Sequence, residues 1–367
     1  MGLFFQGKKN YKTQSLSAIA WKKFCRNKQG LFLLCFLAVI TMMAVLGYLI
    51  TPDDTPYANE QILEIRLMKP MSKVSFLEIE NTHSVEKRNI IEKMLYGQPS
   101  MYTAIPLSSY HLTQDSITAE RLNESPPYNI IRYRLTDISY RITTRTYYLG
   151  TDRYGRDVLS QLIIGARVSL SVGFVSVFIA LIIGVFLGAI SGYYRGKIDE
   201  VIMWFINVVW SIPTLLLVIA ISFVLGTGFW QIFIAIGLTM WVDIARVVRG
   251  QVISLREKEF VEASKALGFR SFTIIFKHII PNITGTIIVV AAANFASAIL
   301  TEASLSFLGI GVQPPMPSWG TMIKENYGYI ILDYAYLAII PGFAIMLLVL
   351  CFMLIGNVLR DVMDMKE

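Results

Sequence analysis

The chain has 367 residues, of which 54% are hydrophobic and only 16% are charged, and its mean hydropathy is +0.53. This composition excludes a soluble globule of this length and indicates a polytopic membrane protein. The net charge of +7 does not indicate nucleic-acid binding, because the basic residues cluster beside apolar segments, where membrane orientation explains them.

The cysteines and histidines indicate neither a disulfide framework nor a metal site. The three cysteines all lie in or beside apolar segments, and the three histidines are far apart in the sequence. We expect no bound metal and no cofactor. A signal peptide is not expected either, because the first apolar block is long and lacks a small-x-small cleavage site.

The N-terminal segment, residues 1–30, carries seven basic residues and no acidic one, so the positive-inside rule predicts that it stays in the cytoplasm. Residues 31–50 follow without a charge. Twenty residues at 1.5 Å each are enough to cross a hydrocarbon layer of about 30 Å. We expect 31–50 to be the first transmembrane helix.

Residues 51–148 differ in composition, with twelve acidic and eleven basic residues. Alternating apolar residues predict strands at 63–67, 131–135 and 138–142, and the stretch from Ser84 to Tyr96, closed by Gly97, predicts a helix. We expect a small α+β domain inserted on the extracytoplasmic side. It is either a docking surface for an external partner or a structural elaboration, and the sequence leaves both open.

Two turn motifs precede the second span in the sequence YLGTDRYGRDVLS. The aspartate of the second motif, Asp157, is suited to cap the helix that follows. A phosphate cradle is not expected, because Asp152 and Asp157 repel anions. The motif residues are Gly150, Thr151, Asp152, Gly155, Arg156 and Asp157.

The second and third spans are predicted at 168–190 and at about 198–225. In the second span, small residues recur four apart, which favours close approach of another helix. In the third span, Ser211, Ile212 and Pro213 predict a kink, because proline interrupts helical hydrogen bonding. Such a kink is either a gate element or a packing bend. The small residues are Ala180, Gly184, Gly188 and Gly192.

The fourth span is predicted from Phe229 to about Val248 and contains an acidic residue, Asp243. A lone acid at the bilayer centre costs about 2.5–3.5 kcal/mol on insertion scales. We therefore expect Asp243 near the interface, paired with Arg246 three residues further on. A structural pair is favoured over a proton relay.

A charged stretch, Arg256 to Asn282, lies between two apolar blocks. Gly268 fits a helix C-cap, and Ser271 fits the N-cap of a second short helix, Phe272 to Ile280. Pro281 suits the first turn of the next helix. The stretch therefore predicts two short helices with a sharp corner. The residues spaced to share one side of the first helix are Phe260, Val261, Ala263, Ala266 and Leu267.

The fifth span is predicted at 283–308, with Glu302 near its outer end, and the sixth lies within 330–359. Between them, residues 304–323 are amphipathic and interrupted by proline and glycine. Eighteen lysine and arginine residues fall on the segments assigned to the cytoplasm and four on the short external loops. Both termini, including the tail 361–367, and the loop 250–281 are therefore expected in the cytoplasm.

The order Glu262, Ala263, Ser264, Gly268 and Pro281 resembles the loop motif of ABC importer permeases, whose first three positions are usually Glu-Ala-Ala. The sequences HIIPN at 278–282, YLGTDRYGRD and SLSFLGIG resemble the oligopeptide and dipeptide branch. The resemblance covers residues 10–50 and 148–365.

The resemblance implies an all-α, six-span, MetI-like permease core at 149–360 in a bacterial inner membrane, with no catalytic residue of its own. It further implies a second permease subunit, two cytoplasmic ABC ATPase subunits and an external substrate-binding protein as partners. Residues 262 to about 270 would be the coupling helix that docks into an ATPase. The coupling residues are then Glu262, Ala263, Ser264, Leu267, Gly268, Phe269 and Pro281.

The substrate class stays open between peptides, nickel complexes and other small solutes. An ion-driven secondary transporter would need paired intramembrane carboxylates or an inverted repeat, and neither is found in the sequence. A membrane-anchored receptor would need only one span.

Overall fold

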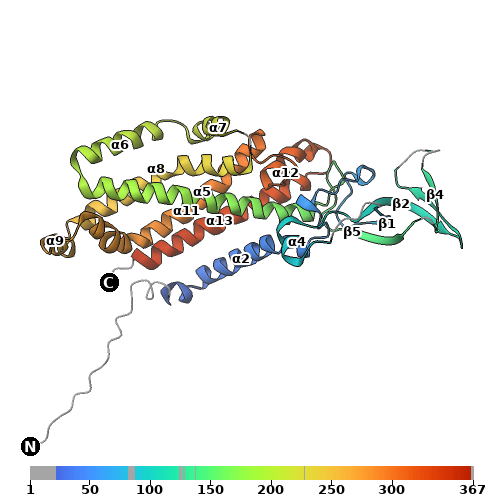
Figure 1. Cartoon of the computed structure of the whole chain (residues 1–367), viewed down its shortest axis with the longest axis horizontal. Helices are drawn as coiled ribbons and strands as arrows, with labels where there is room; N and C mark the ends of the chain where they lie inside the picture. Colours follow the sequence, from blue (N-terminus) through green and yellow to red (C-terminus); the bar gives the residue numbers. More distant parts are fainter. Residues whose placement is uncertain are drawn as a thin grey trace, which may run out of the picture.

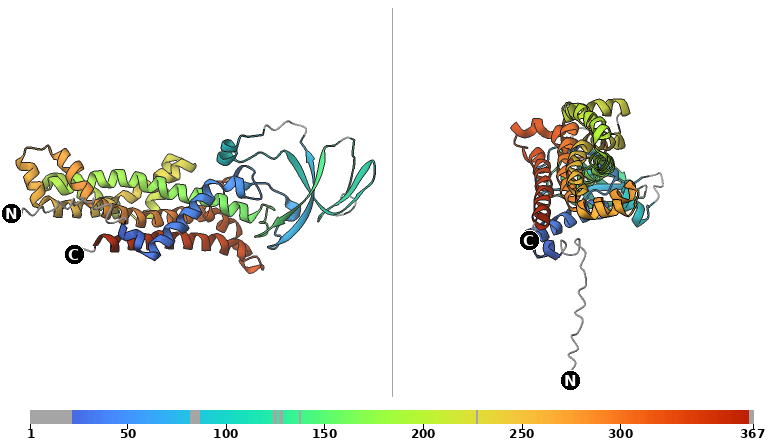
Figure 2. Two further views of the ribbon diagram at one scale, coloured as in Figure 1. Left: turned by 90° about the horizontal axis from the view of Figure 1, so that it is seen from below. Right: turned by 90° about the vertical axis from the view of Figure 1, so that its left-hand side faces the viewer.

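The computed structural model shows a long molecule made of a bundle of helices with a β-sheet at one end (Figure 1 and Figure 2). The short helix α9, Glu259–Ala266, lies at the opposite end of the long axis (Figure 1). The structure describes residues 22–81, 87–123, 126, 129–136, 138–226 and 228–364. The N-terminal segment predicted at 1–30 therefore lies mostly outside the described residues.

Five helical stretches among the described residues are long and apolar enough to cross a membrane, and a bent pair of helices makes a sixth if it counts as one span. The six predicted spans match these stretches in order. Their bounds are α2 Lys28–Val45, α5 Val158–Tyr194, the bent pair α6 Gly196–Trp210 and α7 Thr214–Leu225, α8 Phe229–Arg256, α11 Ile280–Leu308 and α13 Tyr336–Asp364.

The kink predicted at Pro213 is a bend of 92° between α6 and α7. Helix α6 ends at Trp210, and Pro213 is the N-cap of α7. The Pro213 carbonyl accepts a hydrogen bond of 3.1 Å from the backbone N–H of Leu217. Proline has no N–H to continue the helix, so the chain turns at this point. Figure 1 shows the pair as two short helices at the edge of the bundle rather than as one rod.

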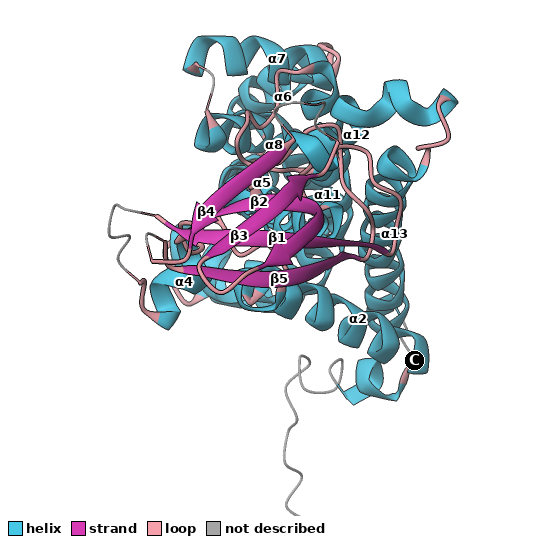
Figure 3. Ribbon diagram, turned by 90° about the vertical axis from the view of Figure 1, so that its right-hand side faces the viewer, coloured by secondary structure: helices cyan, strands magenta, loops and turns pink. Residues whose placement is uncertain are grey.

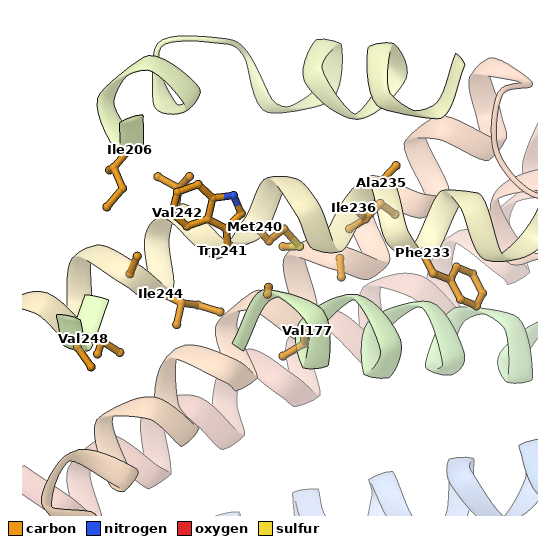
Figure 4. Packing of buried hydrophobic residues seen from close by; sticks show 14 of the residues in the cluster. Val177, Ile206, Phe233, Ala235, Ile236, Met240, Trp241, Val242, Ile244 and Val248 are labelled. Carbon is orange, nitrogen blue, oxygen red and sulfur yellow. The ribbon is translucent and has the colours of Figure 1, made fainter. Parts of the chain in front are cut away.

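Helices α5 and α8 pack closely along the small-residue stripe predicted on α5. A Cβ added at Gly188 would lie 2.4 Å from the carbonyl oxygen of Ala245, and one added at Gly184 would lie 2.7 Å from Cβ of Ile244. Only glycine allows the two backbones to come this close. Figure 4 shows the apolar side chains of α8, including Ile244 and Val248, at this contact.

Helix α6 contacts α8 through few side chains. The rings of Phe205 and Trp241 stack with centroids 5.8 Å apart, and Ile206 points toward α8 (Figure 4). The predicted pair between Asp243 and Arg246 is wrong. Arg246 instead donates to Oδ1 of Asn207 at 2.8 Å, while the Asp243 side chain is exposed. Because α6 brings an amide acceptor within reach, the arginine turns toward it.

The sheet has five antiparallel strands in the order β4-β3-β2-β1-β5 (Figure 3). The strands predicted at 131–135 and 138–142 are confirmed as β4 and β5. Successive side chains of a strand point to opposite faces of the sheet, and each face buries one apolar set. Val74 and Phe76 are buried on one face, and Leu77 and Ile117 on the other. The bounds are β1 Ser72–Glu80, β2 Tyr102–Leu112, β3 Ser116–Arg121, β4 Ile130–Arg134 and β5 Tyr140–Tyr147.

One prediction in this region is wrong, and another is confirmed only in part. Residues 63–67 do not form a strand, because Leu63–Ile65 is a 3₁₀ turn, η2, whose Ile65 carbonyl accepts a hydrogen bond from the Thr151 hydroxyl. The helix predicted from Ser84 is α4, Ile90–Tyr96, which begins after Asn89 because Asn89 and Glu92 form a capping box. Its predicted residues 84–86 lie outside the described part of the chain.

The remaining elements are short. The external segment predicted at 304–323 covers the end of α11, a left-handed Gly309 and the start of α12. Glu302 is fully buried there and accepts a hydrogen bond from the Ser306 hydroxyl at 2.6 Å. The sixth span, predicted within 330–359, is α13, which begins at Tyr336 after the 3₁₀ turn 327–331 and continues beyond 359 to Asp364. The bounds are α3 Gly47–Ile50, η1 Pro56–Ala58, α12 Trp319–Asn326 and η4 Tyr327–Ile331.

Replacing Gly188 with leucine should disrupt the helical bundle, because the new side chain meets the α8 backbone. Overpacking of this kind costs about 3 kcal/mol or more when backbone must move. Gly250→Leu on α8 is the matched control, because a Cβ there meets nothing within 4 Å. We expect a lower Tm and less monodisperse protein in detergent for Gly188→Leu only. Equal Tm values for the two variants would contradict the packing.

Candidate functional site

The charged stretch forms a corner at one end of the molecule. Helix α9, Glu259–Ala266, is followed by Gly268 at φ +76°, a left-handed conformation that favours glycine. Two backbone bonds close the helix, from Gly268 N to Lys265 O at 2.9 Å and from Phe269 N to Ser264 O at 3.2 Å. The predicted corner at Gly268 is therefore confirmed.

The corner is anchored in the same apolar cluster as the long helices. Val261 of α9 is buried, as are Ile274, Ile275 and Ile279 of the next turn, and they share one cluster with Val252 of α8. Four buried aliphatic side chains stabilise the attachment by several kcal/mol, at about 1.5–3 kcal/mol each. The corner therefore moves with α8 and α11 rather than independently of them.

The second arm of the corner runs without a break into the fifth span, contrary to the prediction of a separate helix. It starts as α10, Ser271–Thr273, whose N-cap is Arg270 and not Ser271, and continues as a π-helical turn, Ile274–Ile279. Pro281 lies directly after the π-helical turn, in the first turn of α11. Its lack of a backbone N–H is tolerated at this position. The Asn282 side chain donates to the carbonyl of His278 at 2.6 Å.

Charged and aromatic side chains tie the corner to α5 as well. The buried ring of Tyr193 lies 5.8 Å from the Arg256 guanidinium carbon and 5.7 Å from Nζ of Lys265. Arg195 pairs with Glu257 at 2.6 Å across the surface. The corner is thus fastened to α5, α8 and α11 together.

An ion pair also fastens α6 near this end. Arg249 of α8 donates two hydrogen bonds of 2.6 Å to the carboxylate of Asp199, which also accepts from the Ser191 hydroxyl. This bidentate geometry is the strong form of an arginine-carboxylate contact. No local sequence pattern indicates this pair, because the partners are fifty residues apart in the chain.

The outer side of the corner is apolar and uncovered. Leu267 is 77% exposed, Phe269 48% and Phe272 65%, and the rings of Phe272 and Phe276 lie 4.3 Å apart. The predicted apolar face of α9 is therefore not an inward face, because only Val261 of that set is buried. The tertiary contact uses a narrower strip of the helix and leaves the rest outward.

The coupling residues named from the motif share this corner but differ in role. Glu262 and Ala263 are exposed, whereas Ser264 is buried and its hydroxyl donates to the Phe260 carbonyl at 2.8 Å. The extra hydroxyl relative to alanine is thus satisfied within its own helix. Pro281 is exposed at the start of α11.

The turn motifs at 150–157 form a buried clamp at the other end of α5. Asp152 accepts bonds from the backbone N–H groups of Tyr154 and Arg156, both at 2.9 Å, and from Arg156 Nε at 2.7 Å. Arg156 reaches on to Glu325 of α12 at 2.5 Å. The clamp therefore joins α5 to α12.

The same motif joins α5 to the sheet region. A Cβ at Gly155 would lie 1.8 Å from the Ile62 carbonyl, and one at Gly150 would lie 2.3 Å from the Met68 carbonyl. Both glycines have positive φ, so no other residue fits well. Asp157 caps α5 as predicted, by accepting from Ser160 N at 2.8 Å.

Burial changes the titration of two charged groups in the clamp. Burial alone lowers the pKa of Arg156, but Asp152 and Glu325 outweigh it and raise that pKa. Burial raises the pKa of Asp157 despite its hydrogen bonds from Ser160. Arg156 is therefore the fixed positive charge around which the clamp is built.

Two family models match this chain. The model described as "Binding-protein-dependent transport system inner membrane component" matches residues 184–365, and the "N-terminal TM domain of oligopeptide transport permease C" matches residues 15–70. The matched segments bracket the sheet region and include the corner. They agree with the motifs that carry the resemblance in the sequence.

Characterised relatives are similar over about three fifths of the chain. The oligopeptide transport system permease protein OppC of Haemophilus influenzae is 43% identical over 221 residues, covering 60% of this chain and 71% of that protein. The dipeptide permease protein DppC of Alkalihalophilus pseudofirmus is 45% identical, covering 60% and 72%. The glutathione permease protein GsiD of Pectobacterium atrosepticum is 37% identical, covering 65% and 79%.

A solved structure, the inward-facing MetNI methionine ABC transporter, aligns with a TM-score of 0.47 at 20% identity, covering 56% of this chain and 97% of that one. The sequence matches, rather than this alignment, define the class: a helical polytopic permease of ABC importers, not an enzyme family. The chain belongs to the family of inner membrane components of binding-protein-dependent transport systems, in its oligopeptide and dipeptide branch.

Replacing Arg156 with alanine should destabilise the junction strongly, because it leaves the buried carboxylate of Asp152 without its partner. Removing one member of a buried pair costs about 3–5 kcal/mol. Arg153→Ala is the control, because that side chain is 37% exposed and its ion pair with Glu325 is long, at 4.0 Å. An exposed pair of this kind contributes about 1 kcal/mol or less. Thermal unfolding of both variants measures the difference. A Tm for Arg156→Ala within a degree of that for Arg153→Ala would contradict the clamp.

Proposed function

We propose that this chain is the pore-forming permease subunit of an ATP-driven importer of peptides. The peptide substrate is supported by the relatives, whose names specify oligopeptides, dipeptides and glutathione. In this proposal the chain pairs with a second permease subunit, two cytoplasmic ABC ATPase subunits and an external substrate-binding protein. The chain itself contributes pathway and coupling rather than catalysis.

The observation that carries the coupling role is an uncovered apolar corner on a rigid base. Leu267, Phe269 and Phe272 are exposed on a segment whose other side is buried in the helical core. Exposed apolar patches of this kind mark interaction sites, and an amphipathic helix laid into a groove is a common mode. We assign the groove to the ATPase. Glu262, Ala263, Ser264 and Gly268 position this surface together with Pro281.

The proposed orientation places the corner in the cytoplasm and the sheet on the outer side. It is supported by their position at opposite ends of the long axis (Figure 1) and by the excess of basic residues in the loops on the side of the corner. Residues 51–148 then form an extracytoplasmic insertion, the permease core spans 149–360, and both termini face the cytoplasm.

Coupling follows from how the corner is attached. When ATP closes the two ATPase subunits, the bound α9 moves as a rigid body, because Gly268 and the buried isoleucines fix it to α8 and α11. The two helices then change their angle relative to the second permease. This opens the pathway to one side and closes it to the other.

Replacing Gly268 with valine should uncouple transport from ATP hydrolysis while leaving membrane insertion intact. A Cβ at Gly268 meets nothing within 4 Å, so the variant adds no clash, but a β-branched residue at φ +76° costs about 1–3 kcal/mol. The corner relieves that strain by changing shape. We expect uptake to fall at least tenfold per ATP hydrolysed.

Gly250→Val is the matched control, because it places the same side chain in open space on a regular turn of α8. Uptake and ATPase activity are measured together in proteoliposomes that hold the complete complex. Equal coupling ratios in the two variants would count against the corner.

The peptide assignment is tested in the same proteoliposomes with a radiolabelled hexapeptide outside and ATP inside. We expect accumulation that stops when the ATPase subunits or the binding protein are left out. Accumulation that continues without nucleotide would refute the importer mechanism, and transport of nickel but no peptide would refute the substrate.

A further inference from the structure

The short helix α4 of the sheet region carries exposed apolar side chains. Ile91 is 69% exposed and Leu95 47%, and Ile90 and Tyr96 are exposed as well. Ile91 and Leu95 are four residues apart, so they lie on one side of the helix. Every residue of α4 is exposed or half-buried. These four residues, which we call the α4 patch, therefore form an apolar surface that the described part of this chain does not cover.

The opposite side of α4 is fixed to the loop that follows the first span. Nζ of Lys93 pairs with Asp54 at 2.5 Å, and the Lys93 carbonyl accepts a hydrogen bond of 2.8 Å from the backbone N–H of Gly97. The backbone N–H of Gln98 donates to the Asp54 carbonyl, also at 2.8 Å. Both ends of this contact are short, so α4 holds its apolar patch away from the rest of the chain in a fixed direction.

The first span defines the level of α4 relative to the membrane. Helix α4 packs against α3, Gly47–Ile50, which contains the last residues of the uncharged run 31–50. That run is only about as long as the hydrocarbon layer is thick, about 30 Å at 1.5 Å per residue. Its last residues therefore lie at the outer boundary of the hydrocarbon, and α4 lies beside them. Figure 1 shows α4 where the helical bundle meets the sheet region.

Helix α5 places α4 at the same level. The guanidinium of Arg167 donates to the Met94 carbonyl of α4 at 3.1 Å. Arg167 is the last charged residue before the uncharged run 168–194, which is about 40 Å long at 1.5 Å per residue. Long basic side chains at the ends of spans reach the interface between hydrocarbon and water. Two separate helices therefore place α4 at the membrane surface.

The exposed apolar surface of the first span continues up to α4. Val45, Leu49 and Ile50 are exposed at its outer end, where a span contacts lipid. On α4, Tyr96 is the kind of aromatic residue that is enriched at the interface, and the charged residue Glu92 is exposed beside the apolar side. An apolar side next to a polar one, at this depth, is typical of a helix that lies in the plane of the interface.

We propose that the α4 patch inserts into the outer leaflet of the membrane. The partner is the lipid bilayer itself: Ile91 and Leu95 lie among the first acyl carbons, and Tyr96 lies at the level of the headgroups. Insertion removes apolar side chains from water, which is the driving force. The inserted sheet region is then attached to the membrane at α4 in addition to its covalent connections to the first span and α5. The inference goes beyond the proposed function, because it does not depend on which solute is carried.

The test measures the surroundings of spin labels on α4 in the complete complex in lipid nanodiscs. Single labels are attached at Ile91→Cys and at Leu95→Cys, after the three native cysteines have been replaced by alanine and the reactive cysteines of the partner subunits have been removed. Collision rates are measured with oxygen, which concentrates in lipid, and with the nickel chelate NiEDDA, which stays in water. Ile130→Cys is the matched control, because Ile130 is an exposed isoleucine on the edge strand β4, far from the helices (Figure 1).

We expect the ratio of oxygen to nickel collisions to be at least threefold higher at both α4 positions than at the control position. A ratio equal to that of the control would place the patch in water and overturn the proposal. Low collision rates with both reagents would show that another subunit covers the patch, and this result also contradicts insertion into lipid. Ile90→Cys provides a further position on the same helix if one of the two variants fails to fold.

A depth measurement distinguishes an interfacial helix from a deeply inserted one. The fluorophore NBD is attached at Leu95→Cys, and the nanodiscs contain lipids with a nitroxide at acyl carbon 5 or at acyl carbon 12. We expect quenching by the label at carbon 5 to be at least twofold stronger, because a helix in the interface plane enters only the upper part of the leaflet. Stronger quenching by the label at carbon 12 would refute the interfacial position of α4.

Discussion

The contact between α5 and α8 is the constraint on which the rest of this structure depends. It is the most extensive contact between helices, and it is possible only because glycines on α5 let the α8 backbone approach. Helix α5 carries the clamp at one end and Tyr193 at the other, while α8 leads directly into the corner. One rigid pair therefore connects the two ends of the molecule.

Charged groups are placed where this rigid pair ends. At the corner, Arg249 binds Asp199, and at the other end Arg156 binds Asp152 and Glu325. Charges are costly in hydrocarbon, so spans keep them at their ends and pair them. The pairs also join neighbouring elements, which makes each end a fixed surface rather than a set of loose loops.

The sheet uses its two edges differently. The edge strand β5 leads into the turn motifs before α5, whereas β4 lies at the other end of the sheet, away from α4 (Figure 3). Natural sheets protect edges with charged residues. On β5 the two arginines, Arg141 and Arg145, bind Glu78 on the sheet face, so they flank the edge without covering it.

Local signals in the sequence determined a large part of this protein. The length of apolar runs identified the spans, Gly268 marked the corner, Asp157 marked a helix start, and proline marked the bend between α6 and α7. Each of these features depends on a residue and its neighbours within about one helical turn, so one chain segment is enough to specify it. The family motif at 262–281 likewise lies within one stretch.

Tertiary contacts decided what local signals left open. Periodicity gave α9 an apolar side but not which residues face inward, and packing against α8 buried Val261 and left Leu267 outward. Arg246 and Arg249 each found partners on α6, about forty to fifty residues away, rather than the nearby Asp243. The free edge of β5 exists only because β1 pairs with its other side. The physical reason is that burial, ion pairing and strand pairing depend on distances between segments far apart in the chain, which no single stretch of sequence records.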